Sequence, residues 1–483
     1  MSHPRAAIRP RSTSPRSVVI ILAFIGIVVS LMQTLVIPVL PQLPVLLHSS
    51  ATDVSWIITA TLLAGAVVTP ISGRLGDMFG KRRMLVISLA LLAIGSVLCA
   101  LTSSLPIMLA GRILQGMAAG AIPLGISILR DELPREKVGS AVATMSATMG
   151  VGGAIGLPVA ALIAQNADWH VLFWASAALG AVALVLVAVV LPESPVRTPA
   201  RFDGVGAAGL MVGLVALLLP ITKGADWGWN SPLTLGFFAT AAVVLVLWGV
   251  FELRVASPLV DLRVSARPRV LFTNLASIAV GFAMYAMNLA FPQLLMSPSA
   301  TGYGLGQTMV QAGLALAPGG LVMMLVSPVS ARLTTRRGPK VTLILGAAVI
   351  GAGYVLALFL TSAVWQVIVA SMVIGAGIGL AYAAMPALIM GAVPLTETAA
   401  ANGLNSLMRA FGTSASAAVM GVVLANMTMS LGPVKVPTMA GFHTTFAIGA
   451  AAALVAIALA AFIPGKDRAT AAAAVDSARL VDA

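Results

Sequence analysis

The sequence predicts an all-α membrane protein with about fourteen transmembrane helices. Of the 483 residues, 59% are apolar and only 9% are charged, and the mean hydropathy is +1.03. A soluble domain carries about a quarter charged residues, so this composition cannot supply an ordinary hydrated surface. Apolar runs of the roughly 20 residues that a membrane-spanning helix needs recur along nearly the whole chain. These two observations place the chain in a bilayer.

The apolar runs divide the chain into five parts. A basic tail, 1–17, precedes a six-helix bundle at 18–191. A central linker, 192–269, carries two further spans, a second six-helix bundle occupies 270–464, and a tail fills 465–483. The expected spans are 18–40, 54–73, 84–103, 106–129, 138–164, 169–191, 204–222, 234–253, 270–296, 308–331, 339–361, 364–393, 399–427 and 441–464.

Basic residues indicate the orientation of these spans. Every Lys and Arg except Arg112, Lys223, Arg409 and Lys435 falls on one side of the predicted membrane. Cytoplasmic loops collect such residues, so both termini are expected in the cytoplasm. The net charge of +13 is explained by this topology and does not indicate a nucleic-acid partner. A composition rich in Ala, Val, Leu and Gly, with Arg well above Lys, suggests the cytoplasmic membrane of a bacterium.

The segment GRLGDMFGKRR at 73–83 follows the second span as a short cytoplasmic connection. It combines tight-turn glycines with an acid and a basic cluster. We expect Asp77 to contact the positive N-terminal end of the helix that begins near Ala399. Such a contact can break and re-form as two bundles move. The residues singled out are Gly73, Gly76, Asp77, Gly80, Lys81 and Arg82.

This segment resembles motif A of the major facilitator superfamily, G-x-L-a-D-r-x-G-r-[kr]. Three further segments agree with the family. LAGRILQGMAAG at 109–120 is similar to motif B, and GGAIGLP at 152–158 is similar to the motif C of exporters. LMQTLVIPVLPQL at 31–43 resembles the first-span motif of drug:proton antiporters, and ARLTTRRGPK at 331–340 repeats motif A with Thr335 in place of the acid. The corresponding residues are Arg112, Gln115 and Gly116 in motif B, and Gly152, Gly156 and Pro158 in motif C.

The resemblance implies two six-helix bundles of the major facilitator fold with a two-helix insertion, as in the fourteen-helix drug:proton antiporters. It implies a monomeric secondary transporter, without a cofactor, that exports small organic molecules by alternating access coupled to protons. Motif B would supply Arg112 to the coupling or transport path, although an arginine bonded only to backbone carbonyls is the structural alternative. Motif C would form a hinge or tight seam between the halves, with ordinary small-residue packing as the alternative.

Polar residues inside the spans are candidates for a substrate cavity. Asn402, Asn405, Arg409 and Thr413 follow helical spacing, and a polar stripe at that depth must face protein or a water-filled cavity. Polar cross-links between helices remain the alternative for each candidate. The other candidates are Gln33, Thr34, Tyr285, Asn288, Gln307 and Gln311.

No acidic residue is expected deep inside a span. Where the antiporters carry an acid, the first span reads Leu31-Met32-Gln33-Thr34. Either transport is not coupled to protons, or the coupling uses acids at the membrane interface, near Arg112 or Asp77. A cavity without a carboxylate is expected to favour neutral or anionic compounds over quaternary ammonium dyes.

Two other functions remain open from the sequence. A major facilitator importer or uncoupled facilitator fits the same motifs, with motif C arguing against it. A membrane-embedded enzyme is disfavoured because the four histidines are scattered and no catalytic or metal-binding cluster is evident.

Overall fold

The structure is a computed structural model that describes residues 14–465 except 41, 195, 198, 199 and 433. The tails expected at 1–17 and 465–483 lie almost entirely outside the described residues. Among the described residues, fourteen helices are long and apolar enough to cross a membrane, which confirms the expected number of spans.

Residues up to 190 form the first bundle. Its buried core joins side chains from the first helix to the last, including Leu22, Leu89 and Val187. The elements are α1 (Pro15–Thr34), α2 (Leu43–Leu46), α3 (Ala51–Phe79), α4 (Lys81–Ala100), α5 (Leu105–Gly116), the 3-10 turn η1 (Met117–Gly120), α6 (Ala121–Glu132), α7 (Arg135–Asn166) and α8 (His170–Val190).

A helical hairpin, α9 (Gly204–Trp227) and α10 (Pro232–Glu252), separates this bundle from the second. The second bundle has its own core, which includes Phe291, Tyr354 and Phe446. Its elements, with the short helix before it, are α11 (Leu262–Ser265), α12 (Pro268–Met296), η2 (Ser299–Thr301), α13 (Met309–Leu325), α14 (Ser327–Arg337), α15 (Pro339–Phe359), α16 (Val364–Met390), η3 (Leu395–Glu397), α17 (Thr398–Asn426) and α18 (Met439–Ala461).

Several expected boundaries were wrong. The span expected at 18–40 ends at Thr34, and turns follow it. The spans expected at 106–129 and 308–331 are each divided, the first by η1 and the second at Val326. Glycines and a proline at these points weaken the helix, and neighbouring helices supply the packing that tolerates the break. The chain is also not wholly helical, because β1 (Thr428–Leu431) pairs antiparallel with β2 (Val434–Pro437) between α17 and α18.

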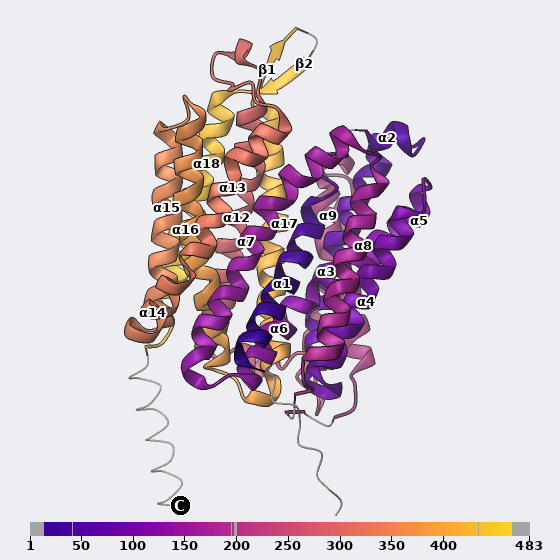
Figure 1. The fold of residues 1–483 in the computed structure, drawn as a ribbon, viewed down its shortest axis with the longest axis vertical. Helices are drawn as coiled ribbons and strands as arrows, with labels where there is room; N and C mark the ends of the chain where they lie inside the picture. The colour runs from indigo at the N-terminus through magenta and orange to yellow at the C-terminus, as the bar shows by residue number, and fades with distance from the viewer. Residues whose placement is uncertain (1–13, 41, 195, 198–199, 433, 466–483) are drawn as a thin grey trace, which may run out of the picture.

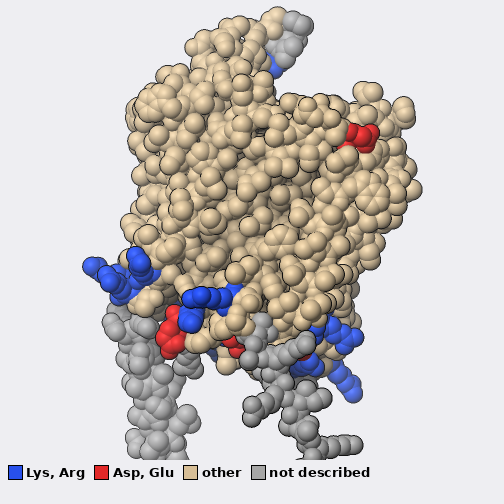
Figure 2. Space-filling model, in the orientation of Figure 1, with Lys and Arg blue, Asp and Glu red and all other residues tan. Residues whose placement is uncertain are grey.

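The two ends of the bundle differ in charge. We call the end where α1 begins and α18 ends the basic end, because Lys and Arg gather there (Figure 2). It includes the start of α4 with Lys81, Arg82 and Arg83, and the end of α14 with Arg336 and Arg337. The β-hairpin lies at the opposite end (Figure 1).

The two halves meet along two seams. On one seam α7 packs against α13 and α16, and on the other α3 packs against α17 (Figure 1). The hairpin helix α9 contacts both α3 and α17. An apolar cluster that includes Val67, Leu214 and Leu407 fills this three-helix contact. The inserted hairpin therefore covers the α3–α17 seam and touches both halves.

Candidate functional site

The motif A segment is mostly helical, which corrects the expected loop. Helix α3 continues through Gly73, Gly76 and Asp77 to Phe79, and α4 begins at Lys81. Only Gly80 lies between them. Its φ of +111° is a backbone conformation that residues with a Cβ rarely adopt. A Cβ at Gly80 would also lie 2.5 Å from Glu193 Oε1. One glycine thus makes the turn and places Asp77 on a rigid helix.

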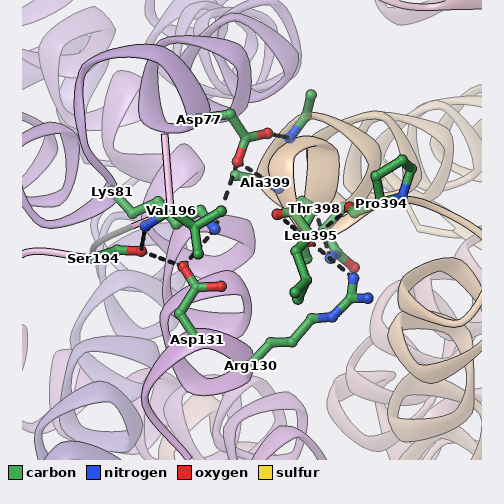
Figure 3. Close-up of polar contacts among 12 residues, drawn as sticks. Asp77, Lys81, Arg130, Asp131, Ser194, Val196, Pro394, Leu395, Thr398 and Ala399 are labelled. Carbon is green, nitrogen blue, oxygen red and sulfur yellow. Dashed lines mark hydrogen bonds and ion pairs between the residues drawn. The ribbon is translucent and has the colours of Figure 1, made fainter. Parts of the chain in front are cut away.

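Asp77 joins the two halves at the basic end (Figure 3). Its Oδ1 accepts a hydrogen bond from the Ala399 amide at 3.2 Å, and its Oδ2 accepts one from the Ala400 amide at 2.9 Å. These amides belong to the first turn of α17, where helical N–H groups lack partners and the helix dipole is positive. Asp77 is 1% exposed. The contact expected from the sequence is therefore present, and we call it the Asp77 contact.

Gly73 allows the helices to come this close. A Cβ at Gly73 would lie 2.4 Å from the carbonyl oxygen of Ala399, which is backbone and cannot swing away. Gly76 is equally crowded, since a Cβ there would lie 2.3 Å from Leu124 Cδ2. Gly73 and Gly76 thus act by close packing, whereas Gly80 turns the chain.

Lys81, which the sequence singled out, and three residues that it did not, Arg130, Asp131 and Ser194, complete the basic end. Lys81 is fully buried, and its Nζ lies 2.6 Å from Asp131 Oδ2 and 3.7 Å from Asp77 Oδ1. Ser194 donates to the same Asp131 oxygen at 2.5 Å. Arg130 donates to Thr398 Oγ1 at 2.9 Å, a second polar link to α17 (Figure 3). In the sequence, the run Arg-Asp-Glu at the basic end of α6 is the pattern that could have pointed to Arg130 and Asp131.

Arg82 forms hydrogen bonds at the basic end with residues of the first half and of the segment that follows it. Its backbone N–H donates to Glu193 Oε1 at 3.2 Å, and its guanidinium donates to the carbonyl oxygens of Val187 and Ala188. Arg82 thus fastens the start of α4 to the end of α8, and it does not reach the other half.

Among the described residues, the second copy of motif A makes no corresponding contact. Gly338 has φ +87° between α14 and α15, as Gly80 has between α3 and α4. Thr335, which stands where the first copy has its acid, is exposed and donates to the Ala331 carbonyl of its own helix at 2.9 Å. The repeat keeps the turn and has lost the acid that would bind a helix end.

A cavity of about 140 Å³ lies between the halves. Pockets for drug-sized molecules usually measure about 300–1,000 Å³, so such a ligand requires the halves to move apart. Five sequence candidates line the cavity. These are Gln33, Gln115, Gly116, Arg409 and Thr413. The other polar residues that line it were not singled out, namely Thr61, Thr69, Tyr382 and Ser406.

The remaining candidates do not line this cavity. Thr34 donates to Leu31 of its own helix at 3.0 Å. Gln307 donates to Leu305 at 2.8 Å, and Gln311 forms a capping box with Thr308 at the start of α13. Such helix-end and intrahelical bonds satisfy polar groups locally, which sequence spacing alone does not reveal. Tyr285 and Asn288 lie on α12 but are not among the lining residues.

Arg409 is the cationic residue of the cavity wall. It donates to Asn405 Oδ1 at 2.6 Å and to Ser406 Oγ at 2.7 Å, and its Cζ lies 5.1 Å from the Tyr382 ring centroid. Asn405 in turn donates to Asn274 at 2.9 Å. Among the described residues, the lining includes no acid. Neutral partners hold the guanidinium in place and leave its charge unneutralised.

The other two members of the polar stripe on α17 bond within their helix. Asn402 Nδ2 donates to the Thr398 carbonyl at 2.9 Å, and Thr413 donates to the Ala410 carbonyl at 2.7 Å. Asn402 is buried beside the α17 N-terminus.

Arg112 lies inside the first half and does not line the cavity. It is 2% exposed, donates to Gln115 Oε1 at 2.6 Å, and reaches the Ile57 carbonyl at 3.5 Å. Gln115 donates to Ser96 at 2.8 Å and itself lines the cavity. Arg112 is therefore linked to the cavity wall through Gln115.

Motif C faces two different neighbours, one in each half. A Cβ at Gly152 would lie 2.6 Å from Ser30 Cβ, and one at Gly156 would lie 2.1 Å from Thr34 Oγ1. Both glycines thus pack on α1 within the first half. Ala154 and Pro158 of the motif meet the other half, where Ala154 abuts Gly320 and Pro158 abuts Gly313 of α13. Gly150 and Gly320, outside the motif, make the close approach between halves.

Substituting Gly152 by Ala should destabilise the first bundle by about 1–3 kcal/mol, because overpacking forces α1 and α7 apart. The adjacent Gly153→Ala is a matched control, since a Cβ there meets nothing within 4 Å. Thermal unfolding in detergent should show a lower Tm for Gly152→Ala and an equal or higher Tm for Gly153→Ala. Equal stability of the two variants would contradict the assigned packing.

Comparisons with known proteins agree with this architecture. The family model described as Major Facilitator Superfamily matches residues 22–417 and 275–479. Multidrug resistance protein Stp of Mycobacterium tuberculosis (strain ATCC 25618 / H37Rv) is 28% identical over 77% of this chain and 68% of its own length. The tetracenomycin C resistance and export protein of Streptomyces glaucescens is 28% identical over 84% of this chain and 75% of its own length. The match to the uncharacterised transporter YhcA of Bacillus subtilis (strain 168), 26% identical over 69% of this chain, spans 62% of that protein.

Solved structures show the same fold. The human organic anion transporter MFSD10 superposes with a TM-score of 0.64 at 17% identity, over 94% of this chain and all of that one. The proton:xylose symporter XylE superposes with a TM-score of 0.63 at 14% identity, over 93% of this chain and 96% of that one. The family model spans most of the sequence, and the two solved transporters share the fold of this chain. This chain is a multi-pass membrane transporter that belongs to the major facilitator superfamily.

Proposed function

We propose that the protein exports small organic molecules across the cytoplasmic membrane by alternating access, driven by proton entry. The observation that carries this proposal is a cavity lined by both halves whose basic-end side is held together by the Asp77 contact. Breaking that contact would open the cavity toward the basic end, and restoring it would close that side. The excess of Lys and Arg supports a cytoplasmic location for the basic end and both termini.

Export is favoured by the relatives. Two of them are named for multidrug resistance and for tetracenomycin C resistance and export. An importer of the same fold would use the same cavity and contact, so direction depends on experiment. For proton coupling, the buried acids at the basic end, Asp77 and Asp131, are the carriers we propose, because the cavity lining itself holds no acid among the described residues.

The cavity supports a preference for neutral or anionic substrates. Arg409 is its charged lining residue, and the polar groups near it are amides and hydroxyls. A cationic substrate would have to enter beside this unneutralised guanidinium at low dielectric, which is unfavourable. An anionic group would instead gain a charge-assisted hydrogen bond.

Everted membrane vesicles test the proposed function directly. With an acidic lumen they should accumulate antibiotics or dyes from a panel of neutral, anionic and cationic compounds, and a protonophore should abolish the accumulation. A reporter fused at Gly228, at the tip of the α9–α10 hairpin, should lie outside the cell. Accumulation only in right-side-out vesicles would contradict export, and accumulation insensitive to the proton gradient would contradict proton coupling.

A further inference from the structure

Two carboxyl groups meet at the basic end of the α9–α10 hairpin, away from the central cavity. Asp203 is the N-cap of α9, and its Oδ1 accepts from the Gly206 amide at 2.7 Å. Glu252 is the last residue of α10. A Cβ at Gly206 would lie 2.3 Å from Asp203 Oδ2 and 2.5 Å from Glu252 Oε1. Asp203 Oδ2 and Glu252 Oε1 can therefore be no farther apart than the sum of these two distances.

Neither of these facing oxygens is neutralised. Glu252 is only 2% exposed, yet Oε1 and Oε2 of Glu252 and Oδ2 of Asp203 have no hydrogen-bond partner in the described part of the chain. The backbone N–H groups of Leu259 and Val260 point toward the Glu252 carboxylate without reaching hydrogen-bond geometry. The Trp248 indole also faces it but donates to the Gly206 carbonyl at 2.8 Å. The charged side chain that faces Glu252 is Asp203, which is another acid.

Two adjacent carboxylates whose facing oxygens are buried and unpaired cannot both stay ionised without a counter-charge, and a single shared proton removes the repulsion. We propose that Asp203 and Glu252 form a proton-binding pair that holds the segment between α10 and α11, 253–261, on the hairpin; this segment is called the linker below. A proton fits better than a metal ion, because Ca²⁺ and Mg²⁺ require about six ligands. Among the described residues, no group of three or more His, Cys, Asp or Glu side chains is placed to hold a metal.

The linker gives this pair its effect on the rest of the molecule. Leu259 and Val260 are 1% and 6% exposed, and they pack in the apolar cluster with Val67 of α3 and Leu407 of α17. Loss of the shared proton leaves two repelling charges beneath the linker and favours its release. The pair thus makes the packing over the α3–α17 seam sensitive to cytoplasmic pH. This inference concerns the hairpin and linker, and it holds whatever the substrate or direction of transport.

Site-specific labelling of the full-length protein in detergent tests the proposal. Val260→Cys in a Cys99→Ser background reports release of the linker through its reactivity with a maleimide. Arg336→Cys, exposed on α14, corrects for the intrinsic pH dependence of the thiol. Corrected labelling at Val260→Cys should rise by about tenfold or more between about pH 6 and about pH 9, since one linked proton changes an equilibrium by up to tenfold per pH unit.

Glu252→Gln separates the proposed pair from other causes. An amide resembles the protonated acid, so labelling at Val260→Cys should stay low across the whole pH range. Glu136→Gln, an exposed acid at the start of α7, is the matched control and should leave the pH dependence unchanged. Infrared spectra of the protein without introduced cysteines should show a protonated carboxylic acid that disappears in Glu252→Gln. Flat labelling with Glu252 intact, an unchanged pH dependence in Glu252→Gln, or protection by sodium chloride but not choline chloride at high pH would each overturn the proposal.

Discussion

Replacing Asp77 by Asn should reduce transport by roughly 10- to 100-fold while leaving the amount of protein in the membrane unchanged. The carboxylate accepts hydrogen bonds from both Ala399 and Ala400. An amide offers only one acceptor oxygen and turns its NH₂ group toward the other donor. Hydrogen bonds to charged groups contribute about 1.5–3 kcal/mol each, and about 1.4 kcal/mol corresponds to tenfold. The equilibrium should therefore shift toward states open at the basic end.

Thiol labelling in everted vesicles measures this shift. Thr413→Cys places a thiol in the cavity wall, and an impermeant reagent should reach it faster in Asp77→Asn than in the parent. Asp53→Asn is the matched control, because it makes the same change at an exposed position at the other end of α3. Unchanged transport together with unchanged labelling in Asp77→Asn would exclude a switching role for the contact.

Arg409→Ala should lower transport of an anionic substrate by roughly 10- to 100-fold and that of a neutral analogue by only a few-fold. Only the anion loses a charge partner, whereas both lose the packing of the side chain. The partners Asn405 and Ser406 are neutral, so removing the guanidinium leaves no buried carboxylate behind. Initial rates in vesicles for a matched anionic and neutral pair give the comparison.

Two further variants sharpen this test. Arg409→Lys keeps the charge but loses the fork that reaches Asn405 and Ser406 together, so anionic transport should be intermediate. Arg336→Ala removes an exposed arginine at the basic end and should leave the anion-to-neutral ratio unchanged. Robust export of a quaternary ammonium dye by the wild type, unaffected by Arg409→Ala, would show that the cavity does not select by charge in this way.

One helix connects the two sites that these variants probe. The first turn of α17 provides the amides that bind Asp77, and Arg409 lies farther along the same helix. Asn402 and Asn405 lie between them. A displacement of α17 at its basic end therefore moves the cavity wall, and a ligand at Arg409 can influence the Asp77 contact through the same rigid element.

The sequence by itself determined the number of spans, the two halves and the position of the acid that joins them. Fourteen apolar runs were sufficient because a bilayer demands that every crossing segment be long, apolar and internally hydrogen-bonded. The glycines, acid and basic residues at 73–83 marked Asp77, and the helical spacing of Arg409 and Thr413 marked one wall of the cavity. These are local patterns, and their physical causes act within one or two turns of the chain.

Only the tertiary structure decided which partners these residues have. Whether a glycine faces its own half or the other depends on helix rotation, and Gly152 and Gly156 face α1 while Gly150 faces α13. Lys81 and Asp131 pair across helices that are far apart in sequence, as do Asp203 and Glu252 across the hairpin. Helix rotation is set by the summed packing of many side chains on several neighbours, and no single motif carries that information.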